Sequence, residues 1–151
     1  MPNWCMNIIY IKHSDKTLLD RVENALKIDE FLTEFLPTPS DTEDWYYWRI
    51  NNWGTKWDVE ATLIERTEFM IKAVYDSAWA PPIVFYNYLC SIGFSVRALY
   101  YEPILNFCGI FDNGEDTYYD IMGMNSEKIK ETIPEELEKE FGILDYFGNT
   151  E

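Results

Sequence analysis

The residues best suited to catalysis lie together near the start of the chain, where His13, Ser14 and Asp15 are consecutive. A serine hydrolase uses these three residue types, but it needs their side chains to converge in space. Adjacent residues at the end of a strand point in different directions, so we expect an exposed turn histidine instead. The sequence contains no P-loop, GxGxxG or HExxH motif. We therefore predict no catalytic residues, although a deep polar pocket lined by Lys56 and Asp58 would favour an enzyme.

Metal binding is the next chemistry that the residue types permit. The chain has three cysteines, Cys5, Cys90 and Cys108, and a single histidine, His13. A structural zinc site would need all four to converge, and their spacing has none of the CxxC pattern typical of such sites. We expect reduced thiols that act as small buried hydrophobic side chains, and we predict no metal and no cofactor.

The strongest local feature is the segment 45–60, WYYWRINNWGTKWDVE, which holds four of the six tryptophans. Each large aromatic side chain buries about 150–250 Å², so the segment is either core or binding surface. In the structural interpretation, Gly54 permits a tight turn with positive φ, and Lys56 and Asp58 form an ion pair or cap backbone groups. In the functional interpretation the cluster recognises a partner, because tryptophan, tyrosine and arginine dominate binding hot spots.

The two halves of this segment favour different interpretations. The second half, together with other aromatic and proline residues, is interpreted as a structural signature: Asn3, Trp4, Trp53, Gly54, Lys56, Trp57, Asp58, Trp79, Pro81 and Pro82. The first half follows an acidic loop, and its residues form the candidate binding surface, with Arg49 and both tyrosines exposed. This candidate surface comprises Asp41, Glu43, Asp44, Trp45, Tyr46, Tyr47, Trp48 and Arg49.

The formal net charge of −15 is concentrated in two blocks. Residues 29–60 carry two basic and eight acidic groups, and residues 113–151 carry three and eleven. Such a surface repels phosphate backbones, which argues against direct nucleic-acid binding, and it suits a partner with a basic groove. Solubility alone is the alternative explanation. If the fold joined the two blocks, the following carboxylates would mimic phosphates: Glu30, Glu34, Asp41, Glu43, Asp44, Glu115, Asp116 and Asp120.

Hydrophobic periodicity and chain breakers predict the elements that position these residues. One helix is expected after Ser14, which would be its N-cap, and a short helical turn at 28–35 is expected to end at the prolines of 36–39. A further helix is expected from Pro81 to Ile92. The last helical region is expected after Ser126 as N-cap, with an interruption at Pro134. Residues 40–44 are expected to be an exposed loop. Strands are expected at 8–12, 59–63, 69–75, 94–101, 104–111 and 117–121, with a hairpin turn at Asn113-Gly114.

This order predicts a single α+β domain of 151 residues with an antiparallel sheet. Residues 1–101 read β-α-β-β-α-β, the order of ferredoxin-like folds, residues 102–125 add a β-hairpin, and residues 126–151 form an acidic helical tail. An RNA-recognition domain shares this order, but the sequence lacks the interleaved basic and aromatic residues that such domains carry on their central strands.

Four motifs occur in register within about the first 100 residues: MPNWCMN at the start, LPTP at 36–39, WGTKWDVE at 53–60, and Trp79-Ala80-Pro81-Pro82. Together they resemble the Api-type proteins of bacteriophages and plasmids, a largely uncharacterised family with a ferredoxin-like domain. The resemblance implies a ferredoxin-like fold and a mobile-element origin, and it implies little about activity.

The functional hypothesis combines these observations. We expect an acidic phage-type factor that binds a host protein, such as a component of anti-phage defence, by occupying its basic, nucleic-acid-binding surface. A non-catalytic structural or accessory module is the alternative, and an enzyme is the third. No apolar run long enough to cross a membrane and no secretory signal is visible, so we expect a cytoplasmic location in a bacterial host.

Overall fold

The computed structural model describes residues 1–148, and the last three residues of the predicted helical tail lie outside this range. Within it the chain is mixed α+β, which confirms the predicted class. The strands are β1 (Trp4–Lys12), β2 (Ala61–Arg66), β3 (Met70–Ala78), β4 (Ser95–Glu102), β5 (Phe107–Asp112) and β6 (Glu115–Asp120). The helices are α1 (Lys16–Lys27), α2 (Phe31–Phe35), α3 (Trp45–Asn52), α4 (Ile83–Ser91), α5 (Ser126–Thr132), α6 (Glu135–Phe141) and α7 (Ile143–Gly148).

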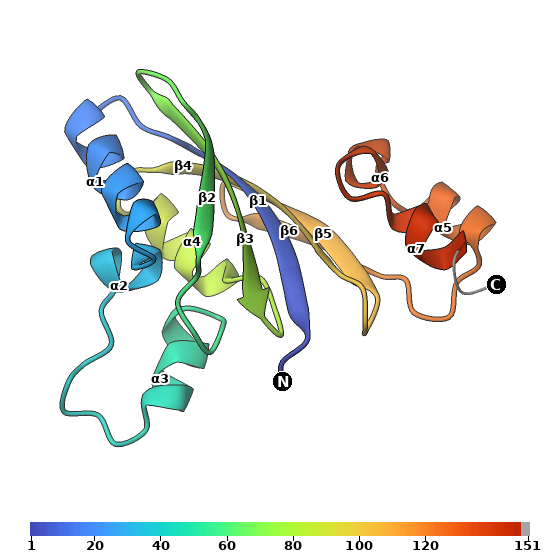
Figure 1. The fold of residues 1–151 in the computed structure, drawn as a ribbon, viewed down its shortest axis with the longest axis horizontal. Coiled ribbons are helices and arrows are strands. Elements are labelled where there is room, and N and C mark those ends of the chain that lie inside the picture. Colours follow the sequence, from blue (N-terminus) through green and yellow to red (C-terminus); the bar gives the residue numbers. More distant parts are fainter. Residues whose placement is uncertain (149–151) are drawn as a thin grey trace.

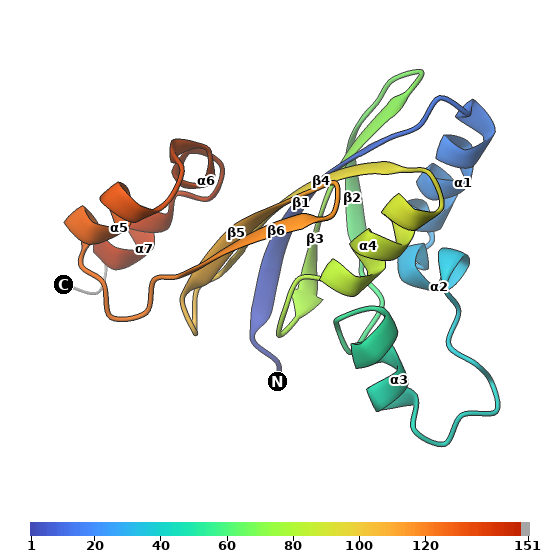
Figure 2. The ribbon, with the colours of Figure 1, turned by 180° about the vertical axis from the view of Figure 1, so that it is seen from behind.

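The six strands form one open sheet in the order β2-β3-β1-β4-β5-β6, and every neighbouring pair is antiparallel. The twisted sheet lies between two groups of helices, α1 to α4 on one side and α5 to α7 on the other (Figure 1). The view from behind shows the same separation (Figure 2). The C-terminal helices therefore cover the second face of the sheet.

The first core fills the space between the sheet and α1, α2 and α4. Alternate strand residues such as Ile9, Ile71 and Val96 point to this side, as the period of two in a strand requires. They pack against apolar residues at helical spacing, including Leu19 in α1 and Phe85 in α4. All five are fully buried, and burial of this kind supplies the main stabilising free energy of the fold.

The second core lies on the opposite face. Ile8, Leu99 and Tyr101 point there from the intervening strand positions and contact Ile129 and Leu137 of the C-terminal helices. The strands are thus buried on both faces where these helices cover them. The sequence pattern did not predict this cover, because a helix pattern does not say which face of a sheet the helix will occupy.

A buried polar network crosses the first core near α4. Asn7 donates through Nδ2 to the Cys5 carbonyl (3.0 Å) and to Ser77 Oγ (2.8 Å), and its Oδ1 accepts from the Tyr86 hydroxyl (3.2 Å). The Tyr75 and Tyr86 hydroxyls are hydrogen-bonded to each other. Burial raises the pKa of both tyrosines, so both remain neutral donors.

Several helix ends differ from the sequence predictions. Helix α1 is capped by Asp15, which accepts from the Thr17 N–H, and α5 is capped by Asn125, so neither Ser14 nor Ser126 is the cap. In each case a longer side-chain acceptor one residue away reaches the free N–H groups of the first turn. Helix α3, over the aromatic segment, was not predicted.

The turns were predicted well. Asn113 and Gly114 adopt φ of +46° and +102° in the β5–β6 hairpin, as a two-residue turn of this type requires. The strand expected at 104–111 begins later, at Phe107. Here the buried Glu102 carboxylate accepts from the backbone N–H groups of Ile104 and Leu105 and holds a turn.

No helix among residues 1–148 is long and apolar enough to cross a membrane.

Candidate protein-binding surface

Helix α3 carries the first half of the aromatic segment and lies beside α4 at one end of the molecule (Figure 1). None of its residues is buried. Trp48 packs partly against the first core, edge-on to Trp53 at 6.0 Å between ring centroids. Trp45, Tyr46 and Tyr47 remain exposed, so this helix presents aromatic rings to the solvent.

The exposed rings continue beyond α3 in one connected series. Tyr46 contacts Trp45 and Tyr47, with centroids 6.2 and 5.7 Å away. The Lys56 ammonium bridges Tyr46 and Trp57, 5.7 and 4.6 Å from the two ring centroids. Trp57 in turn lies 6.2 Å from Trp4 on β1. We call this series the aromatic strip: Trp4, Trp45, Tyr46, Tyr47 and Trp57, each between 37% and 62% exposed.

The strip is anchored by Trp53, which is fully buried and donates from its indole Nε1 to the Leu36 carbonyl at 2.8 Å. Gly54 follows with φ of +86°, a conformation that side chains with a Cβ rarely adopt. A Cβ at this glycine would also lie 3.3 Å from the backbone nitrogens of Ile83 and Val84. Gly54 therefore permits both the turn and its close packing on the start of α4.

Arg49 is half-buried rather than exposed. Its guanidinium donates to Thr38 Oγ1 (3.0 Å) and to the Lys56 carbonyl (3.2 Å), and it lies over the rings of Trp45 and Trp53. Burial lowers its pKa, against an opposing effect of the Asp58 charge. Arg49 therefore holds the α2–α3 loop and the loop after α3 together, and it is a poor choice for a contact residue.

Lys56 and Asp58 do not form the predicted ion pair. The Asp58 carboxylate is taken up by backbone N–H groups: those of Leu32 and Thr33 at 2.9 Å, at the start of α2, and that of Val59 at 2.8 Å. The Lys56 ammonium lies over Trp57 instead. The alternative expectation, that these residues cap backbone groups, holds for Asp58.

The remaining signature residues surround the N-terminal end of the strip. Trp4 pairs with Ala78 across β1 and β3, and the Trp79 N–H donates to the Asn3 carbonyl at 2.8 Å. Trp79 is exposed and has φ of +72°, an uncommon backbone conformation for a bulky residue. Pro81 and Pro82 precede α4, with Pro82 as its N-cap. Trp57, assigned to the structural group from sequence, lies at the surface because the chain turns outward after Gly54.

The acidic loop before α3 is exposed at Asp41, Glu43 and Asp44. Within the described range none of these carboxylates forms an ion pair. The second acidic block does not adjoin this loop. Its residues Glu115 and Asp116 belong to β6, which forms the edge of the sheet opposite β2. The fold therefore does not join the two acidic blocks into one surface.

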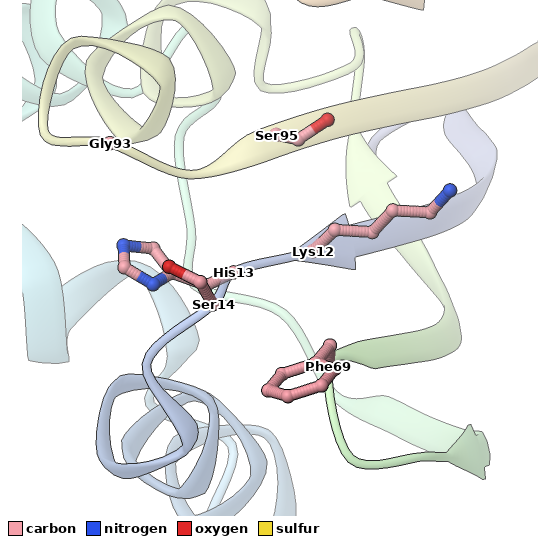
Figure 3. A pocket seen from close by; sticks show the side chains of 6 residues that line it. All are labelled: Lys12, His13, Ser14, Phe69, Gly93 and Ser95. Carbon is pink, nitrogen blue, oxygen red and sulfur yellow. The ribbon is translucent and has the colours of Figure 1, made fainter.

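His13 borders an open pocket of about 460 Å³ at the ends of β1 and β4, lined by Lys12, His13, Ser14, Phe69, Gly93 and Ser95 (Figure 3). Its Nδ1 accepts from the Asp15 backbone N–H at 2.9 Å, while the Asp15 carboxylate caps α1. The Lys12 side chain points away from the imidazole (Figure 3). His13, Ser14 and Asp15 therefore lack the carboxylate–imidazole hydrogen bond that a catalytic triad requires.

The cysteines do not converge. Cys5 lies in a small cluster with Tyr100 and Phe107, whereas Cys108 belongs to the second core on the other face of the sheet. Burial raises the pKa of Cys108 to about 12 and that of Cys5 further, so both are protonated thiols. In the part of the chain that the structure describes, no group of three or more His, Cys, Asp or Glu side chains is placed to hold a metal ion.

Comparison with known protein families, with curated proteins and with solved structures finds no match for this chain. The function must therefore be argued from the surface itself. Sequence reasoning identified Trp45, Tyr46 and Tyr47 but missed the part played by Trp4, Lys56 and Trp57. Their rings and the ammonium meet only because the loop after Gly54 returns the chain to the start of β1.

Proposed function

We propose that this chain is an acidic, non-catalytic protein-binding factor that occupies a basic surface of another protein. The observation that carries the proposal is the aromatic strip, five exposed rings connected through Lys56. Contiguous exposed apolar surface and clustered aromatic residues are typical of protein interfaces.

Charge supports a basic partner. The strip is flanked on one side by the acidic loop with Asp41, Glu43 and Asp44, and on the other by Glu60 and Asp76 near Trp4. None of these five carboxylates has an ion-pair partner among residues 1–148. Lysine or arginine side chains of a partner would complement them, and the same partner surface would be suited to bind nucleic acid.

We also propose a ferredoxin-like core and, on the four sequence motifs, a relationship to Api-type phage and plasmid proteins. The strand order supports the core. β1 and β2 run parallel with β3 between them, and β3 and β4 run parallel with β1 between them, while α1 and α4 cover one face. Two interlocked units of this kind make a split βαβ fold. Under this proposal the partner is a protein of a bacterial host, such as a defence nuclease, and both act in its cytoplasm.

Capture from bacterial lysate tests the proposed function. The chain is tagged after α7, across the sheet from α3 (Figure 1), so that the strip stays free. We expect a basic protein to be retained at low ionic strength and released at about 1 M salt, where the screening length falls to about 3 Å.

The variant Y46A/Y47A separates binding from folding. We expect it to reduce capture at least about tenfold, the effect of losing one hot-spot contact, with little change in unfolding free energy. F69A is the control, because Phe69 is also exposed but lies at the opposite end of β1 and β3. Equal capture by Y46A/Y47A and the unchanged chain, or no captured protein, would contradict the proposal.

Under the alternative hypothesis the chain is a structural or accessory module, and its aromatic residues serve only as core. It accounts for Trp53 but leaves five exposed rings without a role. Under this alternative Y46A/Y47A would not reduce capture without an accompanying loss of stability.

A further inference from the structure

The N-terminal end of the aromatic strip opens into a pocket of about 410 Å³. Its lining consists of two aromatic residues, Trp4 and Trp57, and three acidic residues, Asp58, Glu60 and Asp76. Asp76 and Trp4 share one face of the sheet, because Asp76 pairs with Met6 on β1, two residues from Trp4. The pocket therefore combines aromatic walls with concentrated negative charge.

The aromatic walls are suited to a cation. The Trp4 and Trp57 rings meet at an interplanar angle of 36° with centroids 6.2 Å apart, so they form adjoining walls and not a stacked pair. The Trp57 ring already contacts one cation outside the pocket lining, because Lys56 Nζ lies 4.6 Å from its centroid. Tryptophan is the strongest cation–π partner among the aromatic side chains.

The carboxylates lack an internal counter-ion. Asp58 accepts hydrogen bonds from three backbone N–H groups but forms no ion pair in the described part of the chain. Glu60 and Asp76 have no ion-pair partner in the described part of the chain. Partial burial in the pocket raises the pKa of Asp76, which indicates that its charge is incompletely solvated.

The pocket continues as a groove. Glu60 and Asp76 also line an adjoining cavity of about 380 Å³, whose other walls include Met6, Val74 and Phe141. Glu140 on α6 adds a further carboxylate on the far side. Two adjoining cavities with acidic walls and apolar contacts match an extended chain segment that carries basic side chains.

We infer that the Trp4–Trp57 pocket binds a lysine ammonium or arginine guanidinium from an extended basic segment of the partner, which lies along the groove between β3 and α6. The assignment of this cation to a protein partner rests on the proposed function. The pocket's preference for an organic cation rests on its own residues.

Binding is measured by nuclear magnetic resonance on ¹⁵N-labelled protein. The probe is the peptide Gly-Arg-Gly-Lys-Gly-Arg-Gly, and its neutral counterpart carries citrulline for arginine and norleucine for lysine. We expect the basic peptide to shift the indole N–H signals of Trp4 and Trp57, assigned with W4F and W57F. The signal of Trp53 is the internal reference, because this residue is buried and bonded to Leu36. Equal shifts with the neutral peptide would overturn the inference.

Charge variants distinguish peptide binding in the pocket from non-specific attraction by the protein's overall negative charge. E60Q/D76N is expected to weaken peptide binding about tenfold. The control E115Q/E131Q changes the net charge equally at exposed carboxylates on β6 and α5 and should bind like the unchanged chain. Equal losses in both would show non-specific attraction and overturn the inference. Spermidine, a free polyamine, should bind more weakly than the peptide, and tighter binding would overturn the assignment to a protein segment.

This measurement needs no identified partner, so the two proposals fail separately. If a partner is captured through Tyr46 and Tyr47 but the peptide does not shift Trp4 and Trp57, the pocket assignment alone is wrong. If the peptide binds and no partner is captured, the proposed function is wrong and the cation site stands.

Discussion

Asp58 stabilises the loop that carries part of the candidate surface. Its carboxylate binds the N–H groups of Leu32 and Thr33 at the start of α2, where the N-cap residue Glu30 makes no side-chain cap bond of its own. A negative charge at this position also complements the helix dipole. The residue thus fixes the loop that carries Trp57 to a helix 25 residues earlier in the chain.

We expect D58A to lower the free energy of unfolding by about 1–2 kcal/mol, the usual cost of losing a helix cap. Urea denaturation measures this change. D44A is the matched control, because Asp44 is the N-cap residue of α3 but makes no side-chain cap bond, so its loss should change stability by less than about 0.5 kcal/mol. Similar losses for the two variants would contradict the capping role of Asp58.

At the scale of elements, one ion pair joins the C-terminal helices to the sheet. Arg97 on β4 donates from both terminal nitrogens to Glu136 on α6, at 2.7 and 2.6 Å. These hydrogen bonds, more than the charge of Arg97 alone, lower the pKa of the Glu136 carboxyl. Both side chains are partly exposed, so the pair contributes the modest free energy of a surface salt bridge.

The pH dependence of this contribution has a definite sign. A carboxyl with a depressed folded-state pKa stabilises the protein above its unfolded value, about 4.3 for glutamate. That contribution is lost as the pH falls through the lower folded-state pKa. We expect E136Q to reduce stability by roughly 0.2–1 kcal/mol at neutral pH, with the difference disappearing in acid. Denaturation at several pH values measures it.

E135Q is the control for this experiment. Glu135 is an exposed neighbour on α6 that forms no ion pair among the described residues. Its substitution should leave the pH profile unchanged. A pH-independent effect of E136Q would show that the pair does not act through its charge.

At the scale of the whole molecule, the sheet connects two cores. All six tryptophans lie within residues 4–79, so their fluorescence reports on the sheet and on α3 but not directly on α5 to α7. The C-terminal helices depend on the sheet for burial, since Ile129 and Leu137 pack against Ile8, Leu99 and Tyr101. This shared burial predicts one cooperative unit.

We expect L137A, at a fully buried position, to lower the free energy of unfolding by about 2–5 kcal/mol. Because the unit is cooperative, the transition followed by tryptophan fluorescence should shift together with the one followed by far-ultraviolet circular dichroism. A fluorescence transition that stays in place while the helical signal is lost earlier would mean that α5 to α7 unfold separately from the sheet.

Local chemistry made much of this fold predictable from the sequence. The alternation of residues 69–75 marked a strand, the Asn113-Gly114 pair marked a hairpin, and the prolines after Leu36 marked the end of a helix. These signals depend on side-chain direction and backbone freedom over a few residues. They therefore need no knowledge of the rest of the chain.

The aromatic segment shows what only the tertiary structure decided. The residue types marked this segment as important, and Gly54 indicated where its structural half begins. Whether a given ring is buried, however, depends on which other elements pack against it. Trp53 is buried because Leu36 and α4 surround it, while Trp57 is exposed beside Trp4, more than fifty residues away in the chain. The candidate pocket likewise combines residues from β1, β3 and the loop before β2. Such contacts follow from the packing of distant segments, which no local pattern records.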